Sequence, residues 1–203
     1  MSRYPDYAAA ETAAYELLLR SVQALPVRPL ALLRGVARVI GYDDAAEQLG
    51  LTADEFERRY GQADAFTVRQ GEECLVCCRM DGNPARLNFT LAHELGHIVL
   101  KHTGGSADER EADHFASCLL MPEPVRRRLM TRDDLAAEDA AALCYLSLSA
   151  VRMAMRRRPT TADTELLARL DAIFAAQVNA RKPEFSGLPR HSLQDPRSFA
   201  KKS

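Results

Sequence analysis

Five consecutive residues, His93-Glu94-Leu95-Gly96-His97, form the HExxH pattern. On a helix, residues four apart share one face, so the imidazoles of His93 and His97 can bind one metal ion. Glu94 projects about 100° round the helix, beside the metal's open position, where a water would lie. These residue types at this spacing predict a catalytic Zn²⁺ site, with Glu94 taking a proton from the water during hydrolysis.

A catalytic zinc takes three protein ligands and leaves the fourth position to water, so a further ligand is required. The metzincin pattern would place Gly and His seven and ten residues after His93, where Leu100 and Thr103 stand instead. The metzincin class is therefore excluded. The next predicted helix offers two carboxylates, Glu109 and Glu111.

The apolar face of that next helix separates the two carboxylates. It is defined by Ala112, Phe115, Ala116, Leu119 and Leu120. Glu109 projects within about 50° of the centre of this face, and Glu111 lies about twice as far away. A carboxylate on the core-facing side needs a positive partner, so we expect Glu109 to be the third ligand, with Glu111 in reserve.

Three further residues near the motif could assist the chemistry. Asp113 shares the face of Glu109 and is expected to accept the outer N–H of a metal-bound histidine, with His93 as its partner. A solvated helix residue is the alternative for Asp113. His102 or His114 could polarise a substrate carbonyl, although such histidines are more often surface residues or fully hydrogen-bonded ones.

Composition restricts the class of protein. The chain has 203 residues, 27 Lys and Arg against 28 Asp and Glu, and 47% hydrophobic residues, as expected of a folded globular protein with one core and an appendage. Its longest uncharged stretch, residues 140–151, is well short of the ~20 residues that cross a bilayer. No secretory signal pattern opens the chain, and its five cysteines are an odd number, so we expect a cytoplasmic protein with reduced thiols.

Periodicity and turn signals predict elements that would position the motif. A hairpin is expected over residues 65–80, in which the cysteines of 74–78 act as small buried hydrophobes rather than zinc ligands. The HExxH residues fall in a predicted helix, 89–101, and Glu109 falls in the next one, 108–121. The other predicted helices are 12–25, 29–40, 54–60, 125–130, 135–145, 149–157 and 164–178.

Two stretches carry a resemblance to a known family. FTLAHELGH at 89–97, and EREADHFA at 109–116 leading into LLMP at 119–122, resemble the ImmA/IrrE family of zinc metallopeptidases. The resemblance spans about residues 17–151. Asn88, where the family often has a basic residue, and Asp113, where Asn is commoner, are departures that remove no expected ligand.

The resemblance implies a fold and a function. The fold would be α+β and mainly helical, with a small β-sheet before the HExxH helix and a helical, helix-turn-helix-like region after the peptidase domain. We accordingly divide the chain into a zinc metallopeptidase domain (1–125), the C-terminal helical region (126–179) and a poorly ordered tail (180–203). The resemblance implies a zinc-dependent endopeptidase of the gluzincin type, with Glu109 as third ligand and Glu94 as catalytic residue, that acts as an antirepressor on a helix-turn-helix repressor.

Two other classes of function remain open. A DNA-binding regulator is suggested by the arginine runs 126–128 and 156–158, although such runs are more often solvated helix ends and the net charge of −1 makes direct nucleic-acid binding unfavourable. A zinc-containing sensor that binds a partner without cleaving it is not separable from a protease by sequence. The substrate, the oligomeric state and a second donor to the oxyanion are not specified by the sequence.

Overall fold

Helices dominate the molecule, and one small sheet precedes the HExxH helix. The computed structural model describes residues 3–22, 24–133, 135–157 and 160–180. The predicted α+β, mainly helical class is confirmed. In chain order the elements are α1 (Tyr7–Ser21), α2 (Pro29–Leu33), β1 (Arg38–Gly41), α3 (Tyr42–Gln48), α4 (Ala53–Tyr60), β2 (Ala65–Gln70), β3 (Glu73–Cys78), α5 (Pro84–Val99), α6 (Ser106–Leu120), α7 (Glu123–Met130), α8 (Ala137–Cys144), α9 (Leu148–Met155) and α10 (Thr164–Asn179).

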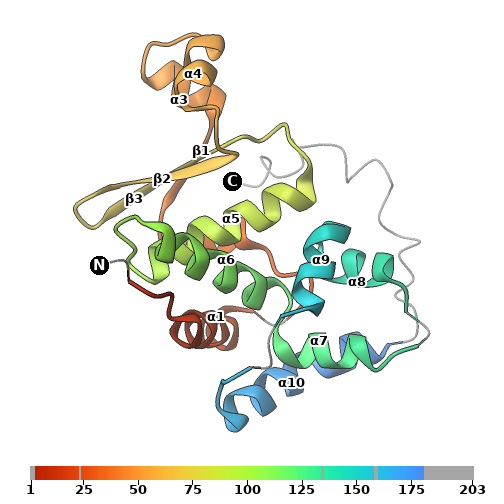
Figure 1. Ribbon diagram of the computed structural model, residues 1–203. Coiled ribbons are helices and arrows are strands. Elements are labelled where there is room, and N and C mark those ends of the chain that lie inside the picture. The colour runs from red at the N-terminus through yellow and green to blue at the C-terminus, as the bar shows by residue number, and fades with distance from the viewer. Residues whose placement is uncertain (1–2, 23, 134, 158–159, 181–203) are drawn as a thin grey trace.

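The sheet has the strand order β1-β3-β2, so β2 is an edge strand (Figure 1). β2 and β3 form the predicted hairpin, turning through Gly71, whose φ of +61° favours glycine. The predicted helix 29–40 is wrong beyond Leu33, because residues 38–41 form β1, parallel to β3. β-Branched Val39 pairs there with Val76, so sheet pairing overrides the helical spacing of this segment.

The sheet separates a small outer layer from the main core (Figure 1). α3 and α4 form an arm on one side, where Tyr42 and Phe56 pack with ring centroids 5.1 Å apart. α5, α6 and α1 are stacked on the other side. Successive residues of β3 alternate between the two sides, with Cys77 in the outer cluster and Cys78 in the main core, which explains why both thiols are buried.

Local sequence fixes the start of α5 and its distance from α6. The side chain of Asn83 accepts hydrogen bonds from the N–H groups of the first turn, and Pro84 follows, so α5 begins five residues before the predicted start at Phe89. Within the HExxH motif, a Cβ at Gly96 would lie 3.2 Å from the Cα of Ala112 on α6. The absent side chain at Gly96 therefore permits the close approach of the two helices that carry the motif and Glu109.

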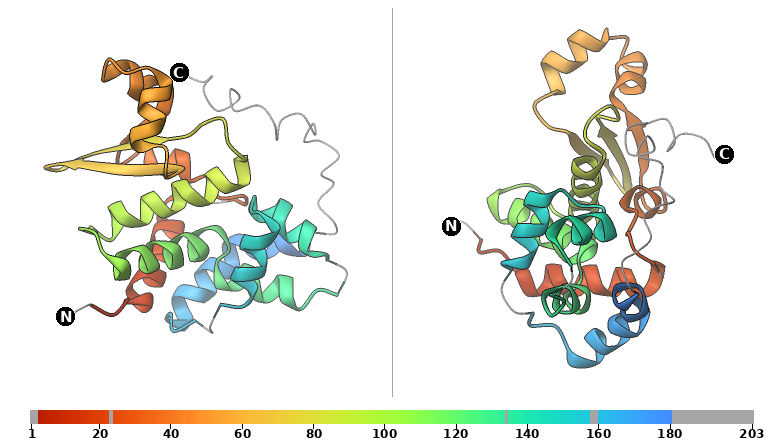
Figure 2. Two further views of the ribbon diagram at one scale, coloured as in Figure 1. Left: turned by 45° about the horizontal axis from the view of Figure 1, so that its top comes forward. Right: turned by 90° about the vertical axis from the view of Figure 1, so that its right-hand side faces the viewer.

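α7 to α10 pack beside α6 and α1 and share their hydrophobic core (Figure 2). At the start of α7, the buried carboxylate of Glu123 accepts hydrogen bonds from Arg126 and Arg127 at 2.7–2.8 Å. Its backbone N–H donates to the hydroxyl of Tyr15 on α1. Arg126 is 7% exposed, so the prediction of a solvated helix end is wrong for this residue.

Two predictions fall wholly or partly outside the described residues. The predicted tail, 180–203, falls outside the described residues except for Ala180, and Arg158 of the second arginine run is outside them too. No helix among the described residues is long and apolar enough to cross a membrane.

Candidate metal centre

Three side chains converge between α5 and α6. His93 and His97 lie one turn apart on α5, and their Nε2 atoms are 2.9 Å from each other. Glu109, in the first turns of α6, places its carboxylate oxygens 3.4 Å from Nε2 of His93 and 3.6 Å from Nε2 of His97. The structure thus brings together the three residues that the sequence predicts as ligands.

The separations of these atoms suit a small divalent cation. A tetrahedral zinc with bonds of about 2.0–2.1 Å holds its ligand atoms about 3.3 Å apart. The three observed separations, 2.9, 3.4 and 3.6 Å, lie on either side of this value. Two imidazoles and one carboxylate are also a donor set of catalytic zinc sites. The residues present therefore fit a zinc ion.

Asp113 orients the first histidine. Its Oδ1 lies 2.9 Å from Nδ1 of His93, and a carboxylate can only accept, so Nδ1 carries the proton. Burial alone would lower the pKa of His93, but the hydrogen bond and charge of Asp113, with the neighbouring carboxylates, raise it. In neutral His93 this tautomer leaves Nε2 with a lone pair that faces Glu109.

Glu94 lies beside the three converging side chains and is held from the sheet. It is 7% exposed, and its Oε2 accepts a hydrogen bond of 2.6 Å from the hydroxyl of Thr67 on β2. Burial raises the pKa of Glu94, and the Thr67 bond only partly opposes the effect. A carboxylate with a raised pKa is suited to accept a proton and return it near neutral pH.

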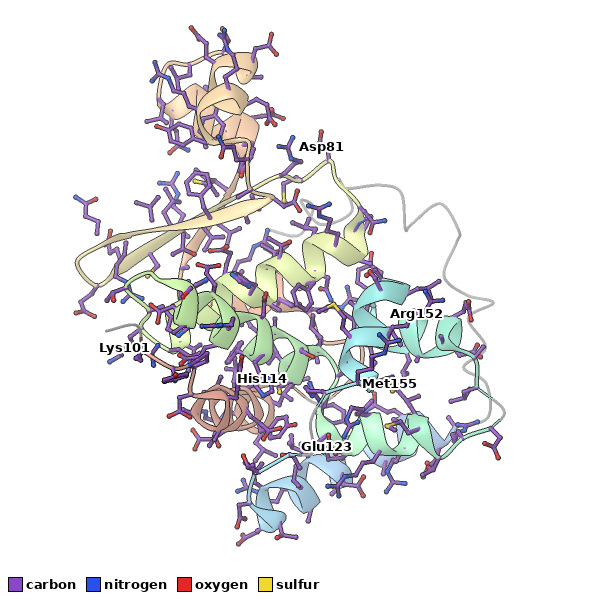
Figure 3. The ribbon with its side chains drawn as sticks, viewed as in Figure 1. Asp81, Lys101, His114, Glu123, Arg152 and Met155 are labelled. Carbon is purple, nitrogen blue, oxygen red and sulfur yellow. The ribbon has the colours of Figure 1, made fainter. Side chains whose placement is uncertain are left out.

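The reserve carboxylate, Glu111, points to a different partner. Its Oε2 lies 3.0 Å from Nε2 of His102, and Nδ1 of His102 lies 3.0 Å from Nδ1 of His97. Both ring nitrogens of His102 are thus engaged, and its side chain is 4% exposed. This arrangement leaves His102 no free nitrogen for a substrate carbonyl. His114, by contrast, lies where α6 faces α1, with its ring 5.1 Å from that of Tyr7 (Figure 3).

Three groups around the centre were not predicted from the sequence. The sequence predicts Thr67 only as a residue of the hairpin, because nothing in the sequence places β2 beside Glu94. Arg3 and the backbone of Asp6 both bind Glu111, although they precede it by more than 100 residues. Long-range partners of this kind have no local sequence signal.

An open cleft of about 2040 Å³ runs past the centre. Residues of the edge strand β2, of α5 and of α6 line it, and so do residues along α9 and just after it. His93, Glu94, His97 and Glu109 all reach its surface. An HExxH helix, a carboxylate from the next helix and a sheet edge above them together define a site of the metallopeptidase class.

Comparison with known proteins agrees with this class. Residues 76–156 match the peptidase family M78, described as the IrrE N-terminal-like domain. This segment, which contains His93, Glu94, His97 and Glu109, is thus similar to the ImmA/IrrE family, and the predicted resemblance is confirmed. The family match supports a metallopeptidase and thus a hydrolase. No curated protein matches the chain.

Proposed function

We propose that the protein is a zinc-dependent endopeptidase that hydrolyses a peptide bond within a protein substrate. The observation that carries the proposal is the convergence of His93, His97 and Glu109, at separations that fit zinc, next to the buried carboxylate of Glu94. When bound, zinc would supply Lewis-acid activation of a water and of the scissile carbonyl.

Glu94 then performs the proton transfers. It takes a proton from the attacking water and returns it to the leaving amine, so its carboxylate must stay beside the reacting atoms. The hydrogen bond from Thr67 holds one oxygen, Oε2, and leaves Oε1 for the proton. Asp113 keeps the ring of His93 in orientation through both steps.

The edge strand β2 offers a place for the substrate backbone. β2 pairs only with β3 in the sheet, and Phe66, Thr67 and Arg69 from β2 line the cleft above α5. An extended peptide can add to such an edge by main-chain hydrogen bonds. Because Thr67 also binds Glu94, a peptide on this strand would pass directly over the general base.

The family resemblance supports a proposal for the substrate class. We propose a helix-turn-helix repressor as the substrate and an antirepressor role for the protease in the cytoplasm. The competing candidate is a zinc-containing protein that binds or senses a partner without cleaving it. Direct DNA binding has less support, because Arg126 and Arg127 are engaged by Glu123, and Arg128 is engaged by Asp171.

Replacing Glu94 tests the proposed activity. The purified chain is loaded with zinc and incubated with a helix-turn-helix repressor encoded beside its gene, with and without a chelator. We expect cleavage that the chelator abolishes and that Glu94→Gln lowers by about 10²–10⁴-fold, because the variant loses the proton acceptor. Its zinc content should stay near one ion per chain.

Glu138→Gln is the matched control, since it makes the same chemical change at an exposed position of α8. It should leave cleavage unchanged. Full cleavage by Glu94→Gln would refute the role of Glu94, and stable binding of the repressor without cleavage by the wild type would favour the sensor alternative.

A further inference from the structure

A chain of hydrogen bonds extends from His97 through His102, which also lines the cleft, to Glu111. Nδ1 of His97 meets Nδ1 of His102 at 3.0 Å, and Nε2 of His102 meets Oε2 of Glu111 at 3.0 Å. Glu111 is 4% exposed, so the chain ends on a buried carboxylate. The HExxH pattern does not predict this series of hydrogen bonds. It acts on His97, whereas Asp113 binds His93.

The direction of each hydrogen bond follows from what the partners can donate. Ionised Glu111 only accepts, so Nε2 of His102 carries the proton. Neutral His102 then has a lone pair at Nδ1, which must accept from Nδ1–H of His97. His97 is thereby fixed in the tautomer whose Nε2 has a lone pair, and this is the nitrogen that faces His93 and Glu109.

The segment before α1 completes the chain. Oε1 of Glu111 accepts the backbone N–H of Asp6 at 2.5 Å, and its Oε2 accepts from Arg3 at 2.9 Å. Arg3 also binds Asp108, which accepts the N–H groups of Thr103 and Gly104. The ion pair with Arg3 and the N–H bond from Asp6 both favour the carboxylate form of Glu111, which can only accept hydrogen bonds.

The same contacts argue against a second metal ion at this position. His102, Asp108 and Glu111 have ligand atoms within 4.8 Å of one another, a spacing that a metal could bridge. However, the Arg3 guanidinium already pairs with both carboxylates, and His102 donates to Glu111. The positive charge that two acidic groups require is therefore supplied from within the chain.

We infer that His102 and Glu111 are positioning residues that hold His97 in the tautomer needed to bind the metal. The inference rests on the proposed metalloprotease function, because it concerns one of the proposed ligands. The carboxylate of Glu111 thus orients His97 indirectly, through the imidazole of His102. The N-terminal residues 3–6 become part of the metal centre by anchoring Glu111.

Zinc affinity and the protonation pattern of His97 test the inference. Zinc binding to the full chain is measured by competition with a chromogenic chelator, without any substrate. His102→Phe keeps ring bulk but removes the acceptor for His97, so we expect zinc affinity to fall by about 10–100-fold. His102→Gln, whose amide oxygen can accept from Nδ1–H, should restore much of it. His114→Phe, the same change at another histidine of this region, should leave it unchanged.

A second readout distinguishes orientation from folding. Long-range ¹H–¹⁵N correlations of the metal-free chain should show the proton of His97 on Nδ1 in the wild type and a mixture of tautomers in His102→Phe. A wild type that binds no zinc would defeat the proposed function. Zinc affinity that is the same in His102→Phe and wild type, or a proton found on Nε2 of His97, would overturn only this inference.

A separate observation concerns the charges that line the cleft. Its acidic residues are Glu11, Asp64, Glu94, Glu109 and Asp113. Each of them has a partner: Asp64 pairs with Arg86, and Glu11 accepts from the hydroxyl of Tyr15, while the other three belong to the metal centre. Each of these carboxylates is therefore directed at a partner within the chain or at the position of the proposed cation.

Three arginine side chains of the cleft, unlike its carboxylates, have no partner among the described residues. Arg69 on β2, Arg110 on α6 and Arg156 at the end of α9 line it from three different elements, and all three are exposed. Within the described ranges, none of these three side chains makes a hydrogen bond or an ion pair. A chain passing through the cleft would meet unpaired positive charge on three sides.

We propose that the substrate segment bound in this cleft carries Asp or Glu side chains. This proposal also rests on the proposed function, and it names the chemistry of the substrate rather than its identity. An extended acidic peptide on β2 would reach Arg69 from the strand and Arg110 from the helix below. Complementary charge of this kind contributes mainly specificity and speed of association.

Binding of labelled peptides tests the charge preference. The probes are fluorescein-labelled 12-residue peptides of equal length, one rich in Glu, one neutral and one rich in Lys, titrated into zinc-loaded Glu94→Gln protein. We expect the Glu-rich peptide to bind most tightly, with Arg110→Glu weakening it by about two- to fivefold and added salt weakening it further. Arg59→Glu, the same charge reversal on the distant α4, is the control and should have no effect.

Each remaining outcome bears on the proposal. Equal affinity for the Glu-rich and neutral peptides, or equal effects of Arg110→Glu and Arg59→Glu, would overturn it. Single-stranded DNA binding as tightly as the Glu-rich peptide would replace it with a nucleic-acid site. If the zinc-loaded wild type does not cleave the repressor, the proposed function is wrong, but the measured charge preference of the cleft still holds.

Discussion

Two clusters of charged side chains lie near opposite ends of α6, and they use their carboxylates in opposite ways. Glu123, at the start of α7, is 2% exposed and is bound by Arg126 and Arg127 at 2.7–2.8 Å. The side chain of Glu109, in the cleft, is 60% exposed and faces two imidazole nitrogens at 3.4 and 3.6 Å. The first carboxylate is saturated by cations of the chain, and the second faces lone pairs.

This contrast separates a structural site from a functional one. A buried carboxylate between guanidinium groups joins helices, and its removal leaves an uncompensated charge. A carboxylate that converges with two lone-pair nitrogens requires a cation from outside the chain. Residue types alone do not distinguish the two, since both clusters contain Glu and basic side chains.

The same substitution in each cluster should have opposite effects. Glu123→Gln leaves Arg126 buried without its partner, so we expect the free energy of unfolding to fall by about 3–5 kcal/mol while zinc affinity stays nearly unchanged. Glu109→Gln alters an exposed side chain, so we expect less than about 0.5 kcal/mol of destabilisation together with a loss of stoichiometric zinc. Urea unfolding of the metal-free chains and metal analysis provide the two readouts.

If Glu109→Gln unfolded the metal-free chain as readily as Glu123→Gln, or if it kept its zinc, the contrast would be lost. The zinc measurement on Glu123→Gln is made well below its melting temperature, so that unfolded chains do not contribute.

Gly96→Ala tests whether the metal centre depends on the approach of α5 to α6. The added Cβ would lie 3.1 Å from Cδ1 of Phe115 and 3.2 Å from Cα of Ala112. We expect this crowding, which costs about 1–3 kcal/mol, to exceed the gain of about 0.5–1 kcal/mol in helix propensity. Thermal unfolding and zinc affinity should both decrease.

Gly82→Ala is the control for this crowding, because a Cβ at Gly82 would approach only the Arg79 side chain, at 4.0 Å. A Gly96→Ala protein as stable as the control, with unchanged zinc affinity, would show that the helices can separate without harm to the site.

Acid should weaken the structural cluster through Glu123. Burial alone would raise the pKa of Glu123, but Arg126 and Arg127 lower it below its ordinary value. A group with a lowered folded pKa contributes stability above its unfolded pKa of about 4.3, and the contribution is lost as pH falls through the folded pKa. Urea unfolding of the metal-free wild type and Glu123→Gln between pH 7 and pH 3 should therefore show a smaller acid-induced decrease in the variant. Equal decreases would contradict this role of Glu123.

The smallest effect is expected where an ion pair is partly exposed. Arg128 on α7 binds Asp171 on α10 at 2.5–2.6 Å, with side chains 31% and 37% exposed. We expect Arg128→Gln to lower the free energy of unfolding by only about 0.2–1 kcal/mol, because water screens the pair. A loss as large as that of Glu123→Gln would mean that exposure does not govern the strength of these clusters.

The sequence predicts the ligand-bearing helices well because their signals are local. HExxH has helical spacing within five residues, and the placement of Glu109 used the apolar face of a single helix. The hairpin of β2 and β3 was also predicted, from the pattern of apolar residues and from the turn residues between the strands. The predicted helix 29–40 failed because β1 is specified by pairing with β3, a partner more than 30 residues away.

Contacts around the metal centre were predicted only for residues that share a helix face with a predicted ligand, as Asp113 does with Glu109. Asp113 was assigned to His93 from helix periodicity, and the structure places them 2.9 Å apart. Thr67, Arg3 and the backbone of Asp6 reach the centre from distant parts of the chain, and no spacing rule connects them with it. The saturation of Glu123 is likewise a property of packing rather than of sequence.

Titration of zinc into the metal-free chain, followed by calorimetry, tests the central claim most directly. We predict one ion bound per wild-type chain, and no stoichiometric binding after His97→Ala, with the far-UV circular dichroism of the variant unchanged. A wild type that takes up no zinc, or a His97→Ala protein that binds it as tightly as wild type, would contradict the account.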